Sequence, residues 1–345
     1  MGDELRVGMI IPFSGPGGQY GPSAQAVTEL AMHDINGSGG IAGHEVAPVW
    51  IDGGKSPDAV ASEVDRMIDE GNIDAVSGWH TSAVRESVAP IVIGRVPYVY
   101  PALHEGGEAE SHVLFSGESP DDQIIPAVRW LRDYKCVERW AIVGDDYIWP
   151  RQSAAFFASH ADDLGVEIVA QRFIPQREVL EGRSLARICE ELSTLPVQGL
   201  LLLMVGQNAA LFNREFARHL ELGGVARFCP LMDENTLLAS GRKGARRLFT
   251  AGGYFSSMNT EGSLELVEGF EREKGPSAPV LSNTAESCYE GLIALKAMLE
   301  RGPSKEPLSY HGPRGLVSIC PDRAIQPIYI AEASDFGFEI LGRIA

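Results

Sequence analysis

The chain has 345 residues, more than the roughly 250–300 that one hydrophobic core usually supports, so we expect two lobes. Hydrophobic residues make up 44% of the sequence and charged residues 22%, which is ordinary for a soluble globular protein. The formal net charge of −18 argues against direct nucleic-acid binding and against an anchor on an anionic membrane.

The five cysteines are widely spaced and form no C-x-x-C pair, which is typical of neither a disulfide framework nor a zinc site. The sequence enters a strand directly after its first residues, without the charged and apolar regions of a signal peptide. No apolar run approaches the roughly 18 residues of a membrane span. We therefore expect no membrane insertion. The location is cytoplasmic as the chain stands, and periplasmic or extracellular if an export signal was removed.

The first third of the chain alternates strands with helices. Apolar runs predict strands at 5–12, 45–52, 74–77 and 96–100. Helical periodicity, together with an N-cap serine and first-turn proline at 56–57, predicts helices over 23–36, from 57 onward and over 82–94. This order predicts a parallel sheet covered by helices on both faces.

The same rhythm restarts near Ser119 and predicts a second α/β lobe up to about residue 250. Its strands are expected at 139–143, 167–173, 199–205 and 227–231, and its helices at 121–134, 152–164, 184–194 and 208–222. Two further helices, 263–274 and 285–301, and two strands, 315–319 and 326–331, must return to complete the lobes. Because no low-complexity linker is present, short hinges should connect them.

Motifs for catalysis are missing from the sequence. The glycine-rich turn at 15–21 fails as a dinucleotide fingerprint because its third glycine would fall at Tyr20. No phosphate-binding loop, H-E-x-x-H motif or G-x-S-x-G elbow occurs. His80 and Ser82 lie close in sequence, but no elbow or oxyanion donor accompanies them. We expect that the protein binds no cofactor and no metal, and that it is not an enzyme. An amidase or esterase on the same fold is the weaker alternative.

Polar and aromatic side chains follow the strands of the first lobe, where ligands bind in open α/β sheets. Trp79, His80 and Ser82 follow the third strand and open a helix, whose first N–H groups can bind a carboxylate or carbonyl oxygen. The alternative for Ser82 is a helix cap. Tyr100 and Ala102 follow the fourth strand, and Tyr100 could equally be an ordinary half-buried tyrosine.

The second lobe has equivalent loops at 144–153, 205–208 and 231–235. The first carries Tyr147 and Trp149, which either form a recognition surface or fold back onto the helix that follows. The third carries Asp233 and Glu234, and Asp233 could instead be a helix N-cap. If two such lobes face each other, these loops line one ligand cleft.

Three segments of the first lobe carry a family resemblance: IPFSGPGGQYG at 11–21, INGSGGIAG at 35–43 and DGGKSP at 52–57. They resemble type I periplasmic binding proteins of the leucine/amide/urea group. Within that group, DYIWPR at 146–151 and GYFSS at 253–257 resemble the amide-sensing regulators of aliphatic amidase operons and the urea and short-chain-amide receptors of ABC transporters. The resemblance covers essentially the whole chain.

The resemblance implies two Rossmann-like lobes with parallel central sheets, joined by three hinge crossovers. The lobes would be 1–118 with 252–325, and 119–251 with 326–345. It implies ligand contacts at Ser82, Tyr100, Ala102, Tyr147 and the loop at Asp233, to which we add Tyr20, Trp79, His80, Trp149 and Glu234.

Three of these positions depart from the amide sensors. Histidine at 80 stands where those have tyrosine, and Ala102 and Asp233 stand at threonine or threonine-like positions. An acidic group at Asp233 or Glu234 is similar to the way amino-acid receptors of the family hold an ammonium group. The ligand is thus a short-chain amide, urea or an amino acid. The partner is an ABC permease or a regulator protein, and a homodimer stays open.

Overall fold

The computed structural model describes residues 4–106, 112–301, 307–320, 323–335 and 337–345. The chain divides into two compact units. Unit 1 comprises Met1–Glu118 and Met258–Gln326, and unit 2 comprises Ser119–Ser257 and Pro327–Ala345. The chain therefore passes between the units three times, and each unit contains segments from both halves of the sequence.

Unit 1 is built on a sheet of five parallel strands in the order β2-β1-β3-β4-β5. The strands are β1 (Leu5–Ile11), β2 (Val46–Asp52), β3 (Ala75–Ser77), β4 (Tyr98–Tyr100) and β5 (Val113–Phe115). The first four were predicted within a few residues. The short β5 was not predicted.

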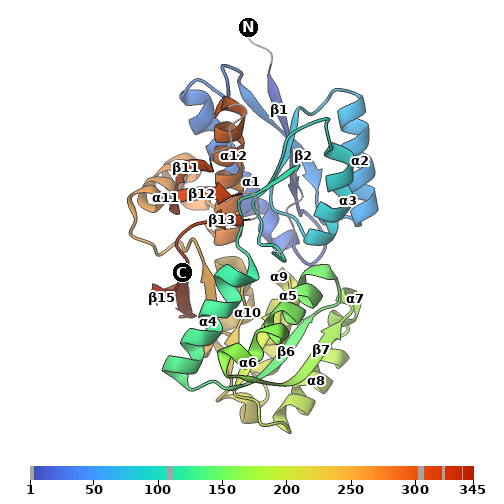
Figure 1. Ribbon diagram of the computed structural model, residues 1–345, viewed down its shortest axis with the longest axis vertical. Coiled ribbons are helices and arrows are strands. Elements are labelled where there is room, and N and C mark those ends of the chain that lie inside the picture. Colours follow the sequence, from blue (N-terminus) through green and yellow to red (C-terminus); the bar gives the residue numbers. More distant parts are fainter. Residues whose placement is uncertain (1–3, 107–111, 302–306, 321–322, 336) are drawn as a thin grey trace. The chain divides into compact units, whose positions relative to one another are not determined.

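Helices cover both faces of this sheet (Figure 1). One side carries α1 (Gly21–Gly37) and α12 (Asn283–Arg301), and the other carries α2 (Pro57–Asp69) and α3 (Ser82–Val92). The helix α11 (Glu261–Lys274) packs on α1. Buried apolar residues recur on one face of each helix, as the periodicity predicted, because that stripe must leave water. A small antiparallel sheet of β11 (Leu308–Gly312), β12 (Gly315–Cys320) and β13 (Arg323–Ile325) completes unit 1.

The seven-stranded sheet of unit 2 has the order β15-β14-β10-β9-β8-β6-β7. Five of its strands are parallel: β6 (Arg139–Asp145), β7 (Glu167–Ile174), β8 (Gly199–Leu203), β9 (Ala226–Phe228) and β10 (Leu248–Gly252). These five strands form the predicted parallel central sheet, and two antiparallel strands extend it at one edge. There β14 (Tyr329–Ala333) runs antiparallel to β10, and β15 (Phe338–Arg343) antiparallel to β14. A tight turn can join two strands only in the antiparallel sense, and β14 and β15 are consecutive.

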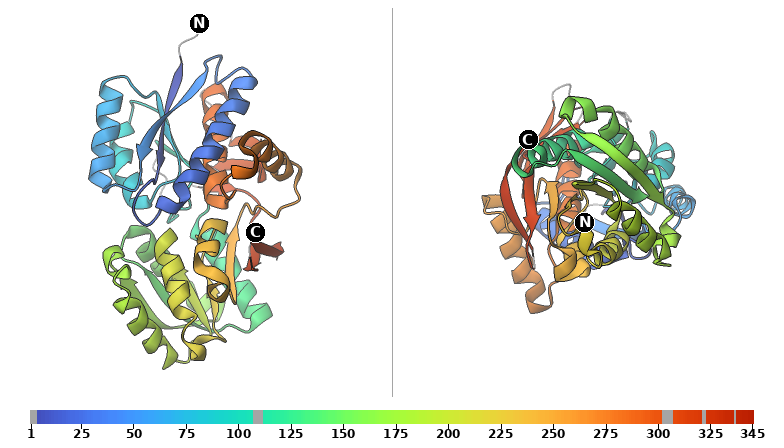
Figure 2. Two further views of the ribbon diagram at one scale, coloured as in Figure 1. Left: turned by 180° about the vertical axis from the view of Figure 1, so that it is seen from behind. Right: turned by 90° about the horizontal axis from the view of Figure 1, so that it is seen from below.

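The helices of unit 2 are α4 (Pro120–Lys135), α5 (Ile148–Ser159), α6 (Ala161–Leu164), α7 (Gln176–Val179), α8 (Arg183–Ser193), α9 (Gly206–Phe216) and α10 (Glu234–Gly244). The rear view in Figure 2 shows α9 and α10 side by side. Two predicted helices are each divided. The first breaks at His160 into α5 and α6, and the second ends at Phe216 before a short 3-10 turn, Leu220–Leu222.

None of the helices in the described part of the chain combines the length and the apolar character needed to cross a bilayer. Residues 1–3, on which the expectation about an export signal partly depends, lie outside the described residues.

Candidate functional site

An aromatic pair lies at the carboxyl ends of β1 and β3 in unit 1. Tyr20 ends the 3-10 turn Gly18–Tyr20 that follows β1, and Trp79 follows β3. Their rings meet edge to face, with centroids 4.9 Å apart, and both side chains are buried. Gly17 lies beside this pair: a Cβ there would be in ordinary contact with the Trp79 ring at 3.6 Å and would be crowded only by Pro12, at 3.1 Å. Two of the predicted site residues are thus brought together.

His80 and Tyr100 form a second buried group. The ring of His80 contacts the carbonyl oxygen of Ile10 through Nδ1 at 3.2 Å and the hydroxyl of Tyr98 through Nε2 at 2.6 Å. The hydroxyl of Tyr100 donates to the carbonyl oxygen of His80 at 2.8 Å. Burial lowers the pKa of His80 to about 3, so the imidazole is neutral at physiological pH. Because these polar atoms are already paired, His80 and Tyr100 shape the site more than they offer hydrogen bonds.

A buried ion pair between Arg85 and Glu105 lies against the ring of Tyr100. The guanidinium of Arg85 lies over the rings of Tyr100 and Phe115, 5.4 Å and 5.3 Å from their centroids. Its Nη1 donates to Glu105 at 3.1 Å. Sequence reasoning missed this pair. Arg85 and Glu105 are twenty residues apart in the chain, and no local pattern connects them.

Ser82 begins α3, and its side chain is 2% exposed. The N-cap is Thr81, whose side chain makes no capping hydrogen bond. The first N–H groups of a helix lack intrahelical partners and carry partial positive charge. The N–H groups at the start of α3 can therefore donate hydrogen bonds to a carboxylate or carbonyl oxygen of a ligand.

Ala102 lies in the loop after β4, which runs beside residues 116–118. The amide of Ser116 donates to the carbonyl oxygen of Tyr100 at 3.1 Å. The amide of His104 donates to the backbone carbonyl oxygen of Glu118 at 2.9 Å. A Cβ at Gly117 would lie only 2.0 Å from the carbonyl oxygen of Ala102. Glycine at 117 is what lets the two backbone segments approach, and it thereby determines where Ala102 lies.

In unit 2, Tyr147 and Trp149 lie at the junction of β6 and α5. Tyr147 is the N-cap of α5 and is half-buried, whereas Trp149 lies in the first turn and is 2% exposed. Their ring centroids are 6.4 Å apart. Arg151 pairs with Asp146 at 2.5 Å and lies 4.6 Å from the ring centroid of Phe173.

Asp145 is a buried residue that sequence reasoning did not select. Its Oδ2 accepts from the amide of Val205 at 2.9 Å, and its Oδ1 from the side chain of Asn208 at 2.8 Å. Burial raises the pKa of Asp145 to about 7, and these two hydrogen bonds oppose that rise. The signal in the sequence that could have identified Asp145 was an aspartate close after an apolar run. Its partners lie sixty and sixty-three residues away and could not be inferred.

Asp233 and Glu234 follow β9 and are both buried. Asp233 is the N-cap of α10, and its Oδ1 accepts from the amide of Thr236 at 2.8 Å, so the capping alternative applies to that oxygen. Glu234 accepts from the amide of Ser256 at 3.0 Å through Oε1, while its Oε2 has no hydrogen-bond partner among the described residues. Burial raises the pKa of Glu234 to about 7, with a contribution from the neighbouring charge of Asp233. A ligand N–H group would satisfy this carboxyl.

A buried charge cluster in unit 1 lies beside two of the crossings between the units. The guanidinium of Arg314 donates to Glu286 at 2.6 Å, to Glu118 at 3.0 Å and to Gln326 at 3.3 Å. Glu118 and Gln326 are the last residues of unit 1 before two of the three crossings. The guanidinium of Arg314 therefore holds in place both Glu118 and Gln326, the two residues at which the chain leaves unit 1.

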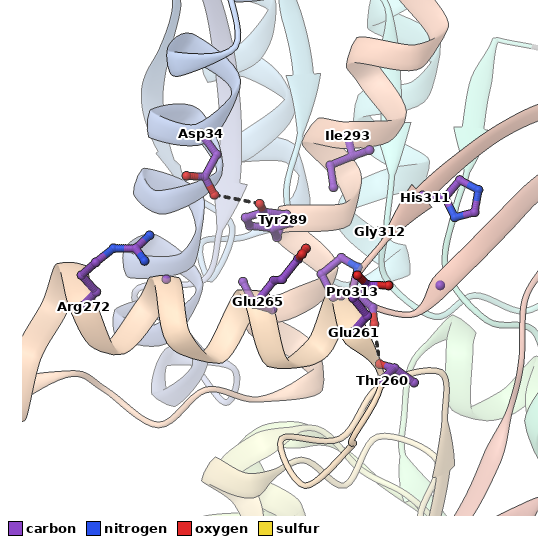
Figure 3. Close-up of a pocket in the computed structure, with 14 residues that line it drawn as sticks. Asp34, Thr260, Glu261, Glu265, Arg272, Tyr289, Ile293, His311, Gly312 and Pro313 are labelled. Carbon is purple, nitrogen blue, oxygen red and sulfur yellow. Dashed lines mark hydrogen bonds between the residues drawn. The ribbon is translucent and has the colours of Figure 1, made fainter.

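A separate pocket of about 520 Å³ lies on unit 1 and contains none of the predicted site residues (Figure 3). The hydroxyl of Tyr289 donates to Asp34 at 2.8 Å at one part of its wall, and Thr260 donates to the carbonyl oxygen of Pro313 at 3.3 Å at another. Its charged wall is mainly acidic. In the part of the chain that the structure covers, no three His, Cys, Asp or Glu side chains are grouped to hold a metal ion.

The sequence from residue 4 to residue 309 matches the family model of periplasmic binding proteins. The chain therefore belongs to the periplasmic binding protein family, and the predicted family is confirmed.

Solved structures agree with this fold. A solute-binding protein of an ABC transporter from Rhodopseudomonas palustris BisB5, solved with 3,4-dihydroxybenzoic acid, is 20% identical with a TM-score of 0.84, covering 99% of this chain and 97% of that one. A branched-chain amino acid transporter substrate-binding protein from Streptococcus pneumoniae, solved with isoleucine, is 13% identical with a TM-score of 0.83 and covers 99% of both chains. A leucine-binding protein from Thermotoga maritima is 17% identical with a TM-score of 0.81, covering 99% and 98%. The two-lobed α/β fold is thus confirmed.

Proposed function

We propose that this protein is the solute receptor of an ABC transporter and that its ligand is an α-amino acid, with short-chain amides and urea as weaker ligands. The family supports a binding role, and the neighbours from Rhodopseudomonas palustris and Streptococcus pneumoniae are described as parts of transporters. The proposed contacts are Tyr20, Trp79, His80, Ser82, Tyr100 and Ala102 of unit 1, and Tyr147, Trp149, Asp233 and Glu234 of unit 2.

The observation that carries the ligand class is the buried carboxyl of Glu234. Its Oε2 has no partner among the described residues, and a buried polar atom without a partner costs free energy. An ammonium group supplies both the missing donor and the opposite charge, and charge-assisted hydrogen bonds are stronger than neutral ones. A neutral amide or urea supplies only the donor. An α-amino acid is therefore the better match.

The other end of the ligand is assigned to the start of α3. Its unpaired backbone N–H groups and the Ser82 hydroxyl would receive the ligand carboxylate. Tyr147, with Trp149 behind it, and the Tyr20–Trp79 pair would exclude water, which strengthens the polar contacts inside.

A thermal-shift screen tests this proposal, because a ligand above its dissociation constant raises the melting temperature. The panel contains the amino acids, acetamide, isobutyramide, urea and 4-hydroxybenzoate. We expect at least one amino acid to give the largest shift, and Glu234→Gln to abolish it. If 4-hydroxybenzoate stabilises the protein and no amine-bearing compound does, the proposed ligand class is wrong.

The enzyme alternative is tested on the same compounds. A receptor leaves an amide or ester intact over hours of incubation, which is checked by chromatography. Hydrolysis that disappears in Ser82→Ala would instead establish an enzyme. A ligand sensor would bind the same compounds but would capture a regulator protein rather than a permease.

A further inference from the structure

A second pocket lies in unit 2, away from all the proposed contacts of the amino-acid site. Its volume is about 640 Å³, within the usual range for small-molecule sites. The wall comes from the end of α9, the 3-10 turn Leu220–Leu222, the start of β9 and the end of α10. The proposed contacts of unit 2 follow the carboxyl ends of β6 and β9, whereas this pocket borders the amino end of β9. The two therefore lie at opposite edges of one sheet.

The pocket is basic although the protein carries a net charge of −18. Its lining includes Arg227, Arg242, Lys243 and Arg246, and Asp335 is its one carboxylate among the described residues. Arg242 pairs with Asp335 at 2.7 Å, so these two charges balance. The other three cations have no ion pair with a carboxylate of the described chain.

Arg227 is the residue that makes this pocket unusual. Its side chain is 2% exposed, and its guanidinium lies 4.6 Å from the ring centroid of Phe216. It donates to Asn213 through Nη1 and to the carbonyl oxygen of Arg246 through Nη2, while Nε has no partner in the described structure. Burial lowers its pKa to about 10. A buried charge without a counterion is costly, so an arginine in this position calls for an anion beside it.

A purely structural role explains only part of this arrangement. Arg242 and Lys243 lie in the last turn of α10, where cations interact favourably with the helix dipole. Arg227 lies on a strand and Arg246 on the loop before β10, so neither serves a helix end of its own. Capping of a helix end therefore does not account for the convergence of Arg227 and Arg246 with Lys243 on one pocket.

We propose that this pocket binds a small phosphate monoester with an apolar body. Three cations without counterions match a group of nearly two negative charges better than they match a single carboxylate. The apolar lining, which is formed by Phe216, Ala217, Leu220, Leu222 and Val225, would cover the organic part. The site is independent of the proposed amino-acid site.

Phenyl phosphate is the probe, and isothermal titration calorimetry at low and high salt is the measurement. We expect saturable binding that weakens with salt, and a loss of at least tenfold in affinity in Lys243→Gln/Arg246→Gln. Both side chains are exposed, so this variant should fold. The matched control is Arg129→Gln, an exposed cation on α4 that does not line the pocket, and it should bind within twofold of the wild type.

Three comparisons sharpen the test. Inorganic phosphate and benzoate should bind more weakly than phenyl phosphate, and the side-chain Nε–H resonance of Arg227 should shift on titration. Tyr147→Ala, which affects the proposed amino-acid site, should leave phenyl phosphate binding unchanged. The inference is overturned if phenyl phosphate shows no saturable binding up to about 10 mM, a level corresponding to about −2.7 kcal/mol. Equal affinity in the double variant and the wild type would overturn it as well.

Discussion

The carboxyl group of Asp145 accepts a hydrogen bond of 2.9 Å from the backbone N–H of Val205, joining the end of β6 to the loop that opens α9. Both oxygens of this carboxyl are used, since Asn208 donates to the second. The contact ties together two strand-end loops of unit 2 without any exposed atom. It also makes the position of Tyr147, two residues further along, depend on a buried acid.

Asp145→Asn should flatten the pH dependence of stability. The pKa of Asp145 is about 7 in the folded protein and ordinarily 3.8, so the unfolded chain releases this proton first as pH rises. The wild type therefore loses stability between about pH 4 and pH 7 relative to the asparagine variant, and the difference is constant above pH 8. Melting temperatures across this range measure the effect, with Asp163→Asn, an exposed acid of α6, as control. Parallel curves for Asp145→Asn and the wild type would contradict it.

Asp145→Ala should be far more harmful than Asp145→Asn. It leaves the amide of Val205 and the side chain of Asn208 buried without their acceptor, at about 1–3 kcal/mol for each unsatisfied group. Urea denaturation measures the loss in free energy of unfolding. A loss below about 0.5 kcal/mol would show that water replaces the carboxylate.

Tyr147→Ala should weaken binding of the amino acid identified in the thermal screen by at least tenfold. The half-buried ring is the proposed cover of the ligand, and truncation would admit water to its polar contacts. Calorimetry measures the dissociation constant, and Tyr134→Ala, which removes a 71% exposed tyrosine of the same unit, is the control. Unchanged affinity in Tyr147→Ala would remove this residue from the proposed site.

Glu234 should make amino-acid binding depend on pH. Its pKa is about 7 in the free protein, so the carboxylate that attracts an ammonium group becomes more populated as pH rises from 6 to 8. We expect affinity to increase over that interval and the dependence to vanish in Glu234→Gln. An exposed-site control is Glu190→Gln on α8. Affinity that falls as pH rises would be evidence against an ammonium group at Glu234.

Arg314→Leu should destabilise unit 1 by about 3–5 kcal/mol, the usual cost of removing one partner from a buried ion pair. Burial raises the pKa of both Glu286 and Glu290, with Arg314 opposing this, so protonation at low pH should partly relieve the loss. The defect should therefore be smaller at pH 5 than at pH 8 in urea denaturation. Arg323→Leu, at an exposed position of β13, is the control. A defect of equal size at both pH values would argue against unpaired carboxylates as its cause.

Much of the fold could be predicted because periodicity is a local property. The buried stripe of α1 and the apolar run of β8 show directly in the sequence, and their order predicts parallel strands. A strand was predicted at 326–331, where β14 lies, but its antiparallel direction was not, because the direction of a strand depends on where the chain returns and not on its residues. The division of one predicted helix at His160 was missed because turn chemistry there is weak.

The sequence by itself determined which loops follow the strands, and therefore which residues are candidates for a site: Ser82 at the start of a helix, Tyr147 after an apolar strand and an acidic pair at 233–234. The sequence could not decide whether Asp233 caps a helix. It also could not show that Glu234 is buried with one carboxyl oxygen unpaired among the described residues. Burial and partners depend on residues far away in the chain. Glu118 and Arg314, which form an ion pair, are 196 positions apart. Only the tertiary structure brings such groups together, because the free energy of a buried charge is set by its neighbours in space.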